Sequence, residues 1–517
     1  MTASRREILQ SLTGGALVGA GGFLIRLPRA DAQVTPDLVR FRPEIEPLVA
    51  LLERTPREKC AAMLVEQLRR GVSYRQLLAA LFLAGIRNVN PRPPGFAMHC
   101  VFVIHSAHLM SLEAPADARM LPLFYAADAF KASQQRDAAA AGGDFTLRAL
   151  AGALPAPERA REEFIAAMEA WEPERAERAA VSLARHAGVP EVFELLWRYG
   201  ARDYRNIGHK AIYVANAHRT LQAIGAEHAE PVLRSVVLAL LDFGREQQVN
   251  GYALEDQCYS SNLKRAKETF GRLKSGWSTE RPDAEATRAV LDAIRGGSPE
   301  EACRQVSGQL VSGSAQAGAV WDAVHLAAAE LRMRARASGL VAVHAVTSAN
   351  ALRHAYRSSG DAATRLLLLL QAVGWMGQFK TYAVAREPDL RPFHIAEMEP
   401  AAAPPQSEAA PSEQVLAEAL GEIPGKADAA AAKAFGLARN AETRQAFLAA
   451  AKRLVLHKAD EAHYYKYAAA LVEDIPLVSP QWQPHLTATL VYYLKGSKDP
   501  EPAAIQRAKE ALRGLPA

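Results

Sequence analysis

The chain has 517 residues, 49% of them hydrophobic, and a formal net charge of +5 at pH 7. This near-neutral balance, with no block of lysine and arginine, argues against nucleic acid as a partner. The four cysteines have no C-x-x-C spacing, which argues against cysteine-ligated zinc, iron–sulfur clusters and c-type haem. Abundant Ala, Leu, Arg and Glu, with few alternating apolar runs, predict an all-α fold built as an irregular array of antiparallel helical hairpins.

The first 32 residues have the parts of a twin-arginine signal peptide. Ser4–Gln10 reads Ser-Arg-Arg-Glu-Ile-Leu-Gln, a glycine-rich apolar run covers Ser11–Ile25, and Ala30–Ala32 supplies small residues for a signal peptidase. We therefore expect the twin-arginine export machinery as a partner and a periplasmic or secreted mature protein that begins near Gln33. No later apolar run predicts an integral membrane segment in the mature form.

The rest of the chain reads as helices joined by short loops. Residues 33–396 form the predicted main helical domain, 397–413 a flexible Ala/Pro linker, and 414–517 a helical segment that completes or flanks the main domain. The polar stretch Asn250–Ser261 is predicted to be a loop. Helices are expected over 44–54, 56–70, 73–87, 96–112, 118–139, 156–171, 173–187, 189–200, 206–225, 229–245, 261–274, 283–296, 298–312, 315–336, 338–358 and 361–386.

Two of these apolar helices carry isolated histidines early in the chain. In Phe96–His108, His105 and His108 share a face and His99 lies away from it. In the next such helix, His209, Tyr213 and Asn216 follow an i, i+4, i+7 polar stripe on an otherwise apolar surface. A single histidine of this kind is more often a hydrogen-bonded core residue than a ligand.

Two later helices repeat the pattern. His344, Thr347, Ser348 and Ala351 line one face with small side chains, which leaves room for a ligand or for a closely packed helix. In the last helix, Asp460, His463, Lys466 and Tyr467 share a face. Imidazole exchanges protons near neutral pH and binds first-row metals, so the four patches fit either an acid–base pocket or a metal site.

A further candidate lies between these patches. Asp322 and His325, three residues apart, could both reach one metal, or Asp322 could orient His325 as a base. A polar contact between two helices is the alternative. Together with His99 and His209 from the early helices, Asp322 and His325 are the candidate metal ligands.

The patches around His344 and His463 resemble the questin oxidase-like proteins. The resemblance rests on His-Ala-Val-Thr at 344–347 with Ala-Leu-Arg at 351–353, on Asp460–Ala468 with its His-x-x-Lys, and on the histidine-bearing helix Phe96–His108. It implies a helical oxidoreductase that opens an aromatic polyketide ring by a Baeyer–Villiger type oxygenation with molecular oxygen and NADPH. By the same resemblance, the catalytic residues are His99, His344, His463 and Lys466.

Three functions follow from these observations. The first is an exported oxidoreductase that acts on an aromatic or other small organic substrate in a histidine-lined pocket. The second is a periplasmic haem- or metal-binding protein, and the third is a helical scaffold for protein interactions in which every histidine is structural. We expect at least two of His99, His344 and His463 to face one pocket. The residues predicted to bind substrate are His209, Tyr213, Thr347 and Tyr467.

Overall fold

The computed structural model describes residues 38–112, 114–140, 143, 145–242, 253–401 and 412–513. The twin-arginine motif, the predicted cleavage site and most of the predicted linker lie outside these residues. Within them the regular structure is helical, and the one β feature is an isolated antiparallel bridge between Leu38 and Arg148. The all-α prediction is confirmed.

The α-helices follow one another along the whole described chain, with short 3-10 turns at several of their ends. Their bounds are α2 Glu46–Arg54, α3 Cys60–Arg69, α4 Tyr74–Asn88, α5 His99–Leu112, α6 Leu121–Ala139, α7 Ala160–Ala170, α8 Pro173–Ala187, α9 Val189–Gly200, α10 His209–Ile224, α11 Ala229–Leu240, α13 Ala253–Phe270, α14 Ala284–Gly296, α15 Pro299–Ser312, α16 Ala317–Arg334, α17 Gly339–Ser358, α18 Ala362–Arg386, α19 Ser412–Glu422, α20 Ala427–Ala438, α21 Ala441–Lys458, α22 Ala462–Asp474, α23 Gln483–Thr489 and α24 Ala503–Arg513.

Local sequence explains where many of these helices begin. Ser73 and Gln76 form a reciprocal capping box at the start of α4. Asp361 accepts a hydrogen bond from the Thr364 backbone N–H at the start of α18, and Ser298 caps α15 in the same way. Gly225, with φ 119°, ends α10 in a backbone conformation that residues with a side chain rarely adopt.

The predicted loop at Asn250–Ser261 is wrong over most of its length, because α13 begins at Ala253. The polar character of this stretch is misleading, since the helix buries Cys258, and Asn262 directly after the stretch, against α18. The Asn262 Nδ2 donates to Gln371 Oε1 at 2.8 Å. Tertiary packing thus satisfies a polar side chain that composition alone would place in solvent.

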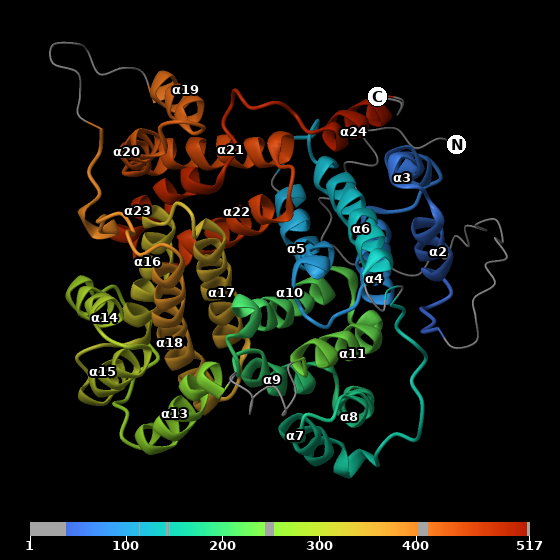
Figure 1. The fold of residues 1–517 in the computed structure, drawn as a ribbon, viewed down its shortest axis with the longest axis horizontal. Helices are drawn as coiled ribbons and strands as arrows, with labels where there is room; N and C mark the ends of the chain where they lie inside the picture. The colour runs from blue at the N-terminus through green and yellow to red at the C-terminus, as the bar shows by residue number, and fades with distance from the viewer. Residues whose placement is uncertain are drawn as a thin grey trace.

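Four helices from distant parts of the chain meet at the centre of the molecule (Figure 1). Helix α10 packs against α5 and α17, and α22 packs against the same two helices. Helix α22 belongs to the C-terminal segment that follows the predicted linker. The centre is therefore built from both sides of that linker.

The surrounding helices enclose this centre (Figure 1). Helix α18 buries its run of leucines, Leu366–Leu370, in the core beside α17. None of the helices in the described residues combines the length and apolar character that a membrane crossing requires. All four cysteines are buried and free.

Candidate metal centre

Four histidines from the four central helices gather in one place. His99 is the first residue of α5, His209 the first of α10, His463 the second of α22, and His344 lies in the second turn of α17. All four side chains are buried. We call these four residues the histidine cluster. Three of the helices thus place their N-terminal ends here, where the helix dipole disfavours a protonated imidazole.

The ring nitrogens of the cluster face one another. His209 Nε2 lies 3.1 Å from His99 Nε2 and 2.9 Å from His344 Nε2. The ligand atoms of these three residues all lie within 4.8 Å of one another, and they form the one such group in the described part of the chain. The His463 ring centroid lies 4.5 Å from that of His99 and 5.0 Å from that of His344. The four rings are therefore close together, but they contact one another and line neither of the two cavities described below.

Hydrogen bonds on the outer side of two rings fix their tautomers. His344 Nδ1 donates to the Leu340 carbonyl oxygen at 2.7 Å, and His463 Nδ1 donates to Glu461 Oε2 at 2.6 Å. The other oxygen of Glu461 accepts a hydrogen bond of 2.7 Å from the Tyr493 hydroxyl. A neutral imidazole with its proton on Nδ1 presents a lone pair at Nε2. Both rings therefore direct a lone pair toward the cluster, as metal-ligating histidines do.

Protons alone do not satisfy the inner side of the cluster. His209 Nε2 faces two other ring nitrogens. In the neutral ring this atom carries at most one proton, which cannot form a good hydrogen bond to both of them. The buried His463 Nε2 and His209 Nδ1 have no hydrogen-bond partner among the described residues. Because unpaired buried polar atoms cost free energy, this arrangement favours a ligand that accepts several lone pairs at once.

Burial keeps the cluster neutral. It lowers the pKa of His99, His209 and His344 well below the usual value, and nearby Lys466 and the other imidazoles lower it further. Burial also lowers the pKa of His463, although its partner Glu461 opposes this shift. Neutral imidazoles are the form that coordinates metal ions, so the cluster is ready for coordination at pH 7.

Lys466 stands beside the cluster on α22. Its ammonium nitrogen has no hydrogen-bond partner among the described residues and lies 6.0 Å from the centre of the Phe102 ring. The same Phe102 ring stacks on His209 at 5.5 Å. Burial lowers the pKa of Lys466 to about 7, against a partial opposing effect of Glu461. Lys466 can therefore both give and take a proton near neutral pH.

An unusual turn brings His209 to its position. Asn206 and Ile207 have φ values of 57° and 50°, and Gly208 follows with 81°. A Cβ on Gly208 would lie 2.1 Å from Ser348 Oγ on α17, so only glycine allows this approach. The next residue after His209, Lys210, is buried and bonded to Asp203 at 2.7 Å. Backbone strain of this kind at a non-glycine residue is typical of functional sites.

The residues predicted to bind substrate divide into three groups. His209 belongs to the cluster itself. Thr347 lines a chamber of about 10 Å³ beside Lys466, enough for about one water molecule. For the other two the predicted role stays a prediction: the Tyr213 hydroxyl donates to Ser235 Oγ and the Tyr467 hydroxyl donates to the Thr489 carbonyl oxygen. Neither tyrosine lines this chamber or the cleft described below.

The proposed pairing of Asp322 with His325 is not present. His325 Nδ1 lies 3.3 Å from Asp474, whereas Asp322 accepts a hydrogen bond from the Ser479 backbone N–H at 3.0 Å. Neither residue belongs to the cluster. His325 ties α16 to the last residue of α22, and Asp322 ties it to the segment that follows; this corresponds to the interhelical contact that was the alternative.

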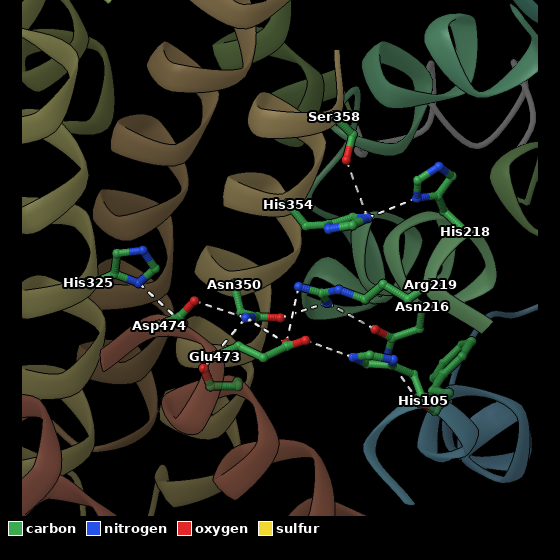
Figure 2. A network of polar contacts seen from close by, with 12 residues as sticks. His105, Asn216, His218, Arg219, His325, Asn350, His354, Ser358, Glu473 and Asp474 are labelled. Carbon is green, nitrogen blue, oxygen red and sulfur yellow. Dashed lines mark hydrogen bonds and ion pairs between the residues drawn. The ribbon is translucent and has the colours of Figure 1, made fainter. Parts of the chain in front are cut away.

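A second polar layer, which the sequence did not reveal, crosses the same four helices (Figure 2). Glu473 lies at its centre: its carboxylate is 2.8 Å from His105 Nε2, 3.1 Å from Arg219 and 3.1 Å from the Asn350 amide. We call these four residues the carboxylate layer. The sequence offered one signal for it, since Glu473 and Asp474 are acids in a helix of mostly apolar residues.

The carboxylate layer separates two cavities. On one side is the chamber beside Lys466 and Thr347, and on the other is an open cleft of about 560 Å³. All four residues of the layer line both cavities. A molecule in the cleft is thus separated from the chamber by this one set of side chains.

Comparison with known proteins adds nothing to this geometry: the chain matches no protein-family model, no curated protein and no solved structure.

Proposed function

We propose that the histidine cluster binds one redox-active first-row metal ion, iron or copper, and that the protein is an oxidoreductase acting on a small organic substrate. The observation that carries this proposal is the convergence of three Nε2 atoms at 2.9 and 3.1 Å, with the unpaired His463 Nε2 beside them. Sites rich in imidazole suit iron, copper, nickel and zinc.

The spacing fits a single ion. Nitrogens at 2.0–2.1 Å from a tetrahedral ion are about 3.3–3.4 Å apart, so the pairs His209–His99 at 3.1 Å and His209–His344 at 2.9 Å need to open by only a few tenths of an ångström. His463 lies outside the group of ligand atoms that are within 4.8 Å of one another, and it becomes a fourth ligand only by moving closer. Haem fits less well, because the chamber beside Lys466 holds only about one water molecule, whereas a porphyrin ring needs far more space. Of the two groups in the second predicted function, haem and a metal ion, the geometry thus favours the metal ion.

The residues around the cluster have separate roles in this proposal. A bound iron or copper ion supplies electron transfer and activates oxygen. Glu461 and the Leu340 carbonyl orient His463 and His344, as outer hydrogen bonds do in metal sites. Lys466, next to the chamber, moves protons during the reaction. The resemblance of the His344 and His463 patches to questin oxidase-like proteins supports an oxygenase acting on an aromatic substrate.

The direct test is metal binding by the purified protein. We expect the protein as isolated to contain about one equivalent of iron or copper, and the chelated protein to take up one equivalent of Co²⁺ with visible d–d absorption. The variant His344→Gln should fold, as circular dichroism would show, and should lose this absorption.

A matched change keeps the test specific. His325→Gln also alters a buried histidine, but one outside the cluster, and it should bind Co²⁺ as the unmodified protein does. Absence of Co²⁺ uptake by the folded protein would refute the metal site. It would leave the metal-free acid–base pocket and the scaffold as the remaining functions.

A further inference from the structure

The cleft above the carboxylate layer has the size of a ligand site. It encloses about 560 Å³, within the usual range for small organic ligands. One part of its lining is apolar, with Leu109, Leu112, Ala223 and Leu477. Leu112 is 47% exposed, which is high for a leucine, and it lies where a bound molecule would cover it.

The other part of the lining is positively charged. Three guanidinium groups line the cleft, those of Arg219, Arg353 and Arg357, together with two acids, Glu473 and Asp474. Burial raises the pKa of Asp474 to about 8, so this acid is neutral at pH 7, whereas Glu473 is ionised. The cleft therefore carries an excess of positive charge.

The histidines of the cleft do not change this balance. Burial lowers the pKa of His105, of His108 to about 4, and of His354 well below its usual value, so all three are neutral at pH 7. His354 also shares a hydrogen bond of 3.0 Å with His218 (Figure 2). The charge that a ligand meets is thus that of the arginines.

Two of these arginines have guanidinium donors that no acceptor of the described residues occupies. Arg353 is 1% exposed, and only one of its terminal nitrogens meets a carboxylate, Glu280 at 2.7 Å. Its Nε and Nη1 are buried without a hydrogen-bond partner among the described residues. Arg357, one turn further along α17, is exposed and forms no ion pair in the described part of the chain. Paired guanidinium donors of this kind recognise carboxylates.

We propose that the cleft binds a small organic acid with a flat apolar body, its carboxylate held by Arg353 and Arg357. The apolar body would lie on the leucines and point toward the carboxylate layer. From Arg357 to Asn350 the helix rises about 10 Å, which matches the length of a two-ring aromatic acid. The binding of this acid in the cleft is independent of the proposed function. Its further role as the substrate of the histidine cluster rests on the proposed function.

The test compares an acid with a neutral molecule of the same shape. The two probes are 2-naphthoate and 2-naphthalenemethanol, titrated into the full chain by calorimetry at pH 7.5. We expect the acid to bind at one equivalent and at least tenfold more tightly than the alcohol. Arg357→Leu should weaken the acid about tenfold and leave the alcohol unchanged. Arg386→Leu, a change of an exposed arginine on α18 outside the cleft, should affect neither probe.

Equal affinities for acid and alcohol, or an Arg357→Leu variant that binds the acid normally, would overturn the proposed acid site. The metal-free variant His209→Ala separates this outcome from the proposed function. It should still bind 2-naphthoate, and loss of binding in this variant would mean that the acid binds the metal instead of the cleft. A natural protein that binds 2-naphthoate but takes up no Co²⁺ would retain the acid site and refute the metal centre.

Discussion

The same four central helices carry two buried polar layers of opposite character. Helices α5, α10, α17 and α22 contribute one histidine each to the histidine cluster, and further along each helix one residue to the carboxylate layer. In the carboxylate layer every cationic or neutral donor meets the Glu473 carboxylate. In the cluster, nitrogens face nitrogens with no acid between them.

This difference indicates that the carboxylate layer is structural and that the histidine cluster is a ligand site. His99 and His105 are six residues apart on α5, about 9 Å along the helix, and both are largely buried. His105 is satisfied by a carboxylate within the protein, whereas His99 faces the Nε2 of another histidine. Buried polar groups are normally paired, so the layer that lacks internal partners is the one expected to take an external ion.

The largest expected effect separates the two kinds of histidine on one helix. His209→Ala removes the central nitrogen of the cluster, and we expect metal affinity to fall by more than about a hundredfold, since losing an outer partner alone costs 10–100-fold. His218→Ala, on the same helix, changes a histidine that contacts His354 and Trp197. It should retain the metal, as measured by elemental analysis. Equal metal loss in both variants would remove the distinction between the two layers.

The next effect concerns stability in the carboxylate layer. Glu473→Gln leaves Arg219 without its ion pair, and breaking a buried pair costs about 3–5 kcal/mol in the free energy of unfolding. Burial would raise the pKa of Glu473, but Arg219 and His105 hold it at about 2.

The sign of the pH dependence follows from this lowered pKa. The stabilisation by Glu473 is complete above the unfolded value of about 4.5 and is lost as the pH falls toward 2. Urea unfolding should therefore show a large difference between natural protein and Glu473→Gln at pH 7 and a smaller one at pH 3. Metal affinity should be the same in both proteins, and a parallel loss of metal would contradict the separate roles of the layers.

A smaller effect is expected at the glutamate that supports the cluster. Glu461→Gln removes the negative charge that orients His463, and outer partners of this kind typically change metal affinity 10–100-fold. Its unfolding free energy should change less than that of Glu473→Gln, because Glu461 is partly exposed and pairs with no arginine among the residues that the structure describes. A competitive chelator titration measures the affinity. An unchanged affinity would show that Glu461 only packs against Tyr493.

The sequence predicted the histidines of the site better than their surroundings. An isolated histidine on an apolar helix is visible as a break in pattern, and four such breaks marked His99, His209, His344 and His463. Their mutual distances depend on how four helices cross, which no local pattern records. The hydrogen bonds of Tyr213 to Ser235 and of Tyr467 to Thr489 were not predicted for the same reason, because a shared helical face does not say which neighbour fills the space in front of it.

The all-α fold followed from composition and periodicity, and the exception at α13 is instructive. Asn262, which directly follows the stretch predicted to be a loop, is a polar residue that composition would expose, but its amide bonds Gln371, which is itself buried on α18. Likewise, Glu473 gave only a weak signal, because an acid near the end of a helix is usually solvated. Both residues are explained by partners more than a hundred positions away, and such pairing is decided by the tertiary structure alone.

The smallest expected effect is a pH step in metal affinity caused by Lys466. This ammonium lies next to the cluster and contributes to the lowered pKa of all four histidines. With a pKa of about 7, Lys466 is charged below pH 7 and repels a metal cation, so affinity should rise about tenfold as the pH increases from 6 to 8. Burial lowers the pKa of His99, His209 and His344 well below the usual value, so these three histidines add no step in this range. Lys466→Met should bind metal with little pH dependence.

Lys466→Met also has a readout that does not involve metal. Because folding lowers the pKa of Lys466 from 10.5 to about 7, the buried ammonium opposes folding fully below pH 7, and this cost disappears as the pH rises toward 10.5. The metal-free variant should therefore be more stable than the metal-free natural protein at pH 6 and more nearly equal to it at pH 10. Lys380→Met, a half-buried lysine on α18 bonded to backbone carbonyls, is the control and should leave the metal step unchanged. If the metal affinity of Lys466→Met also rose about tenfold between pH 6 and pH 8, the titrating group would not be Lys466. The role of Lys466 as the proton carrier of the cluster would then be contradicted.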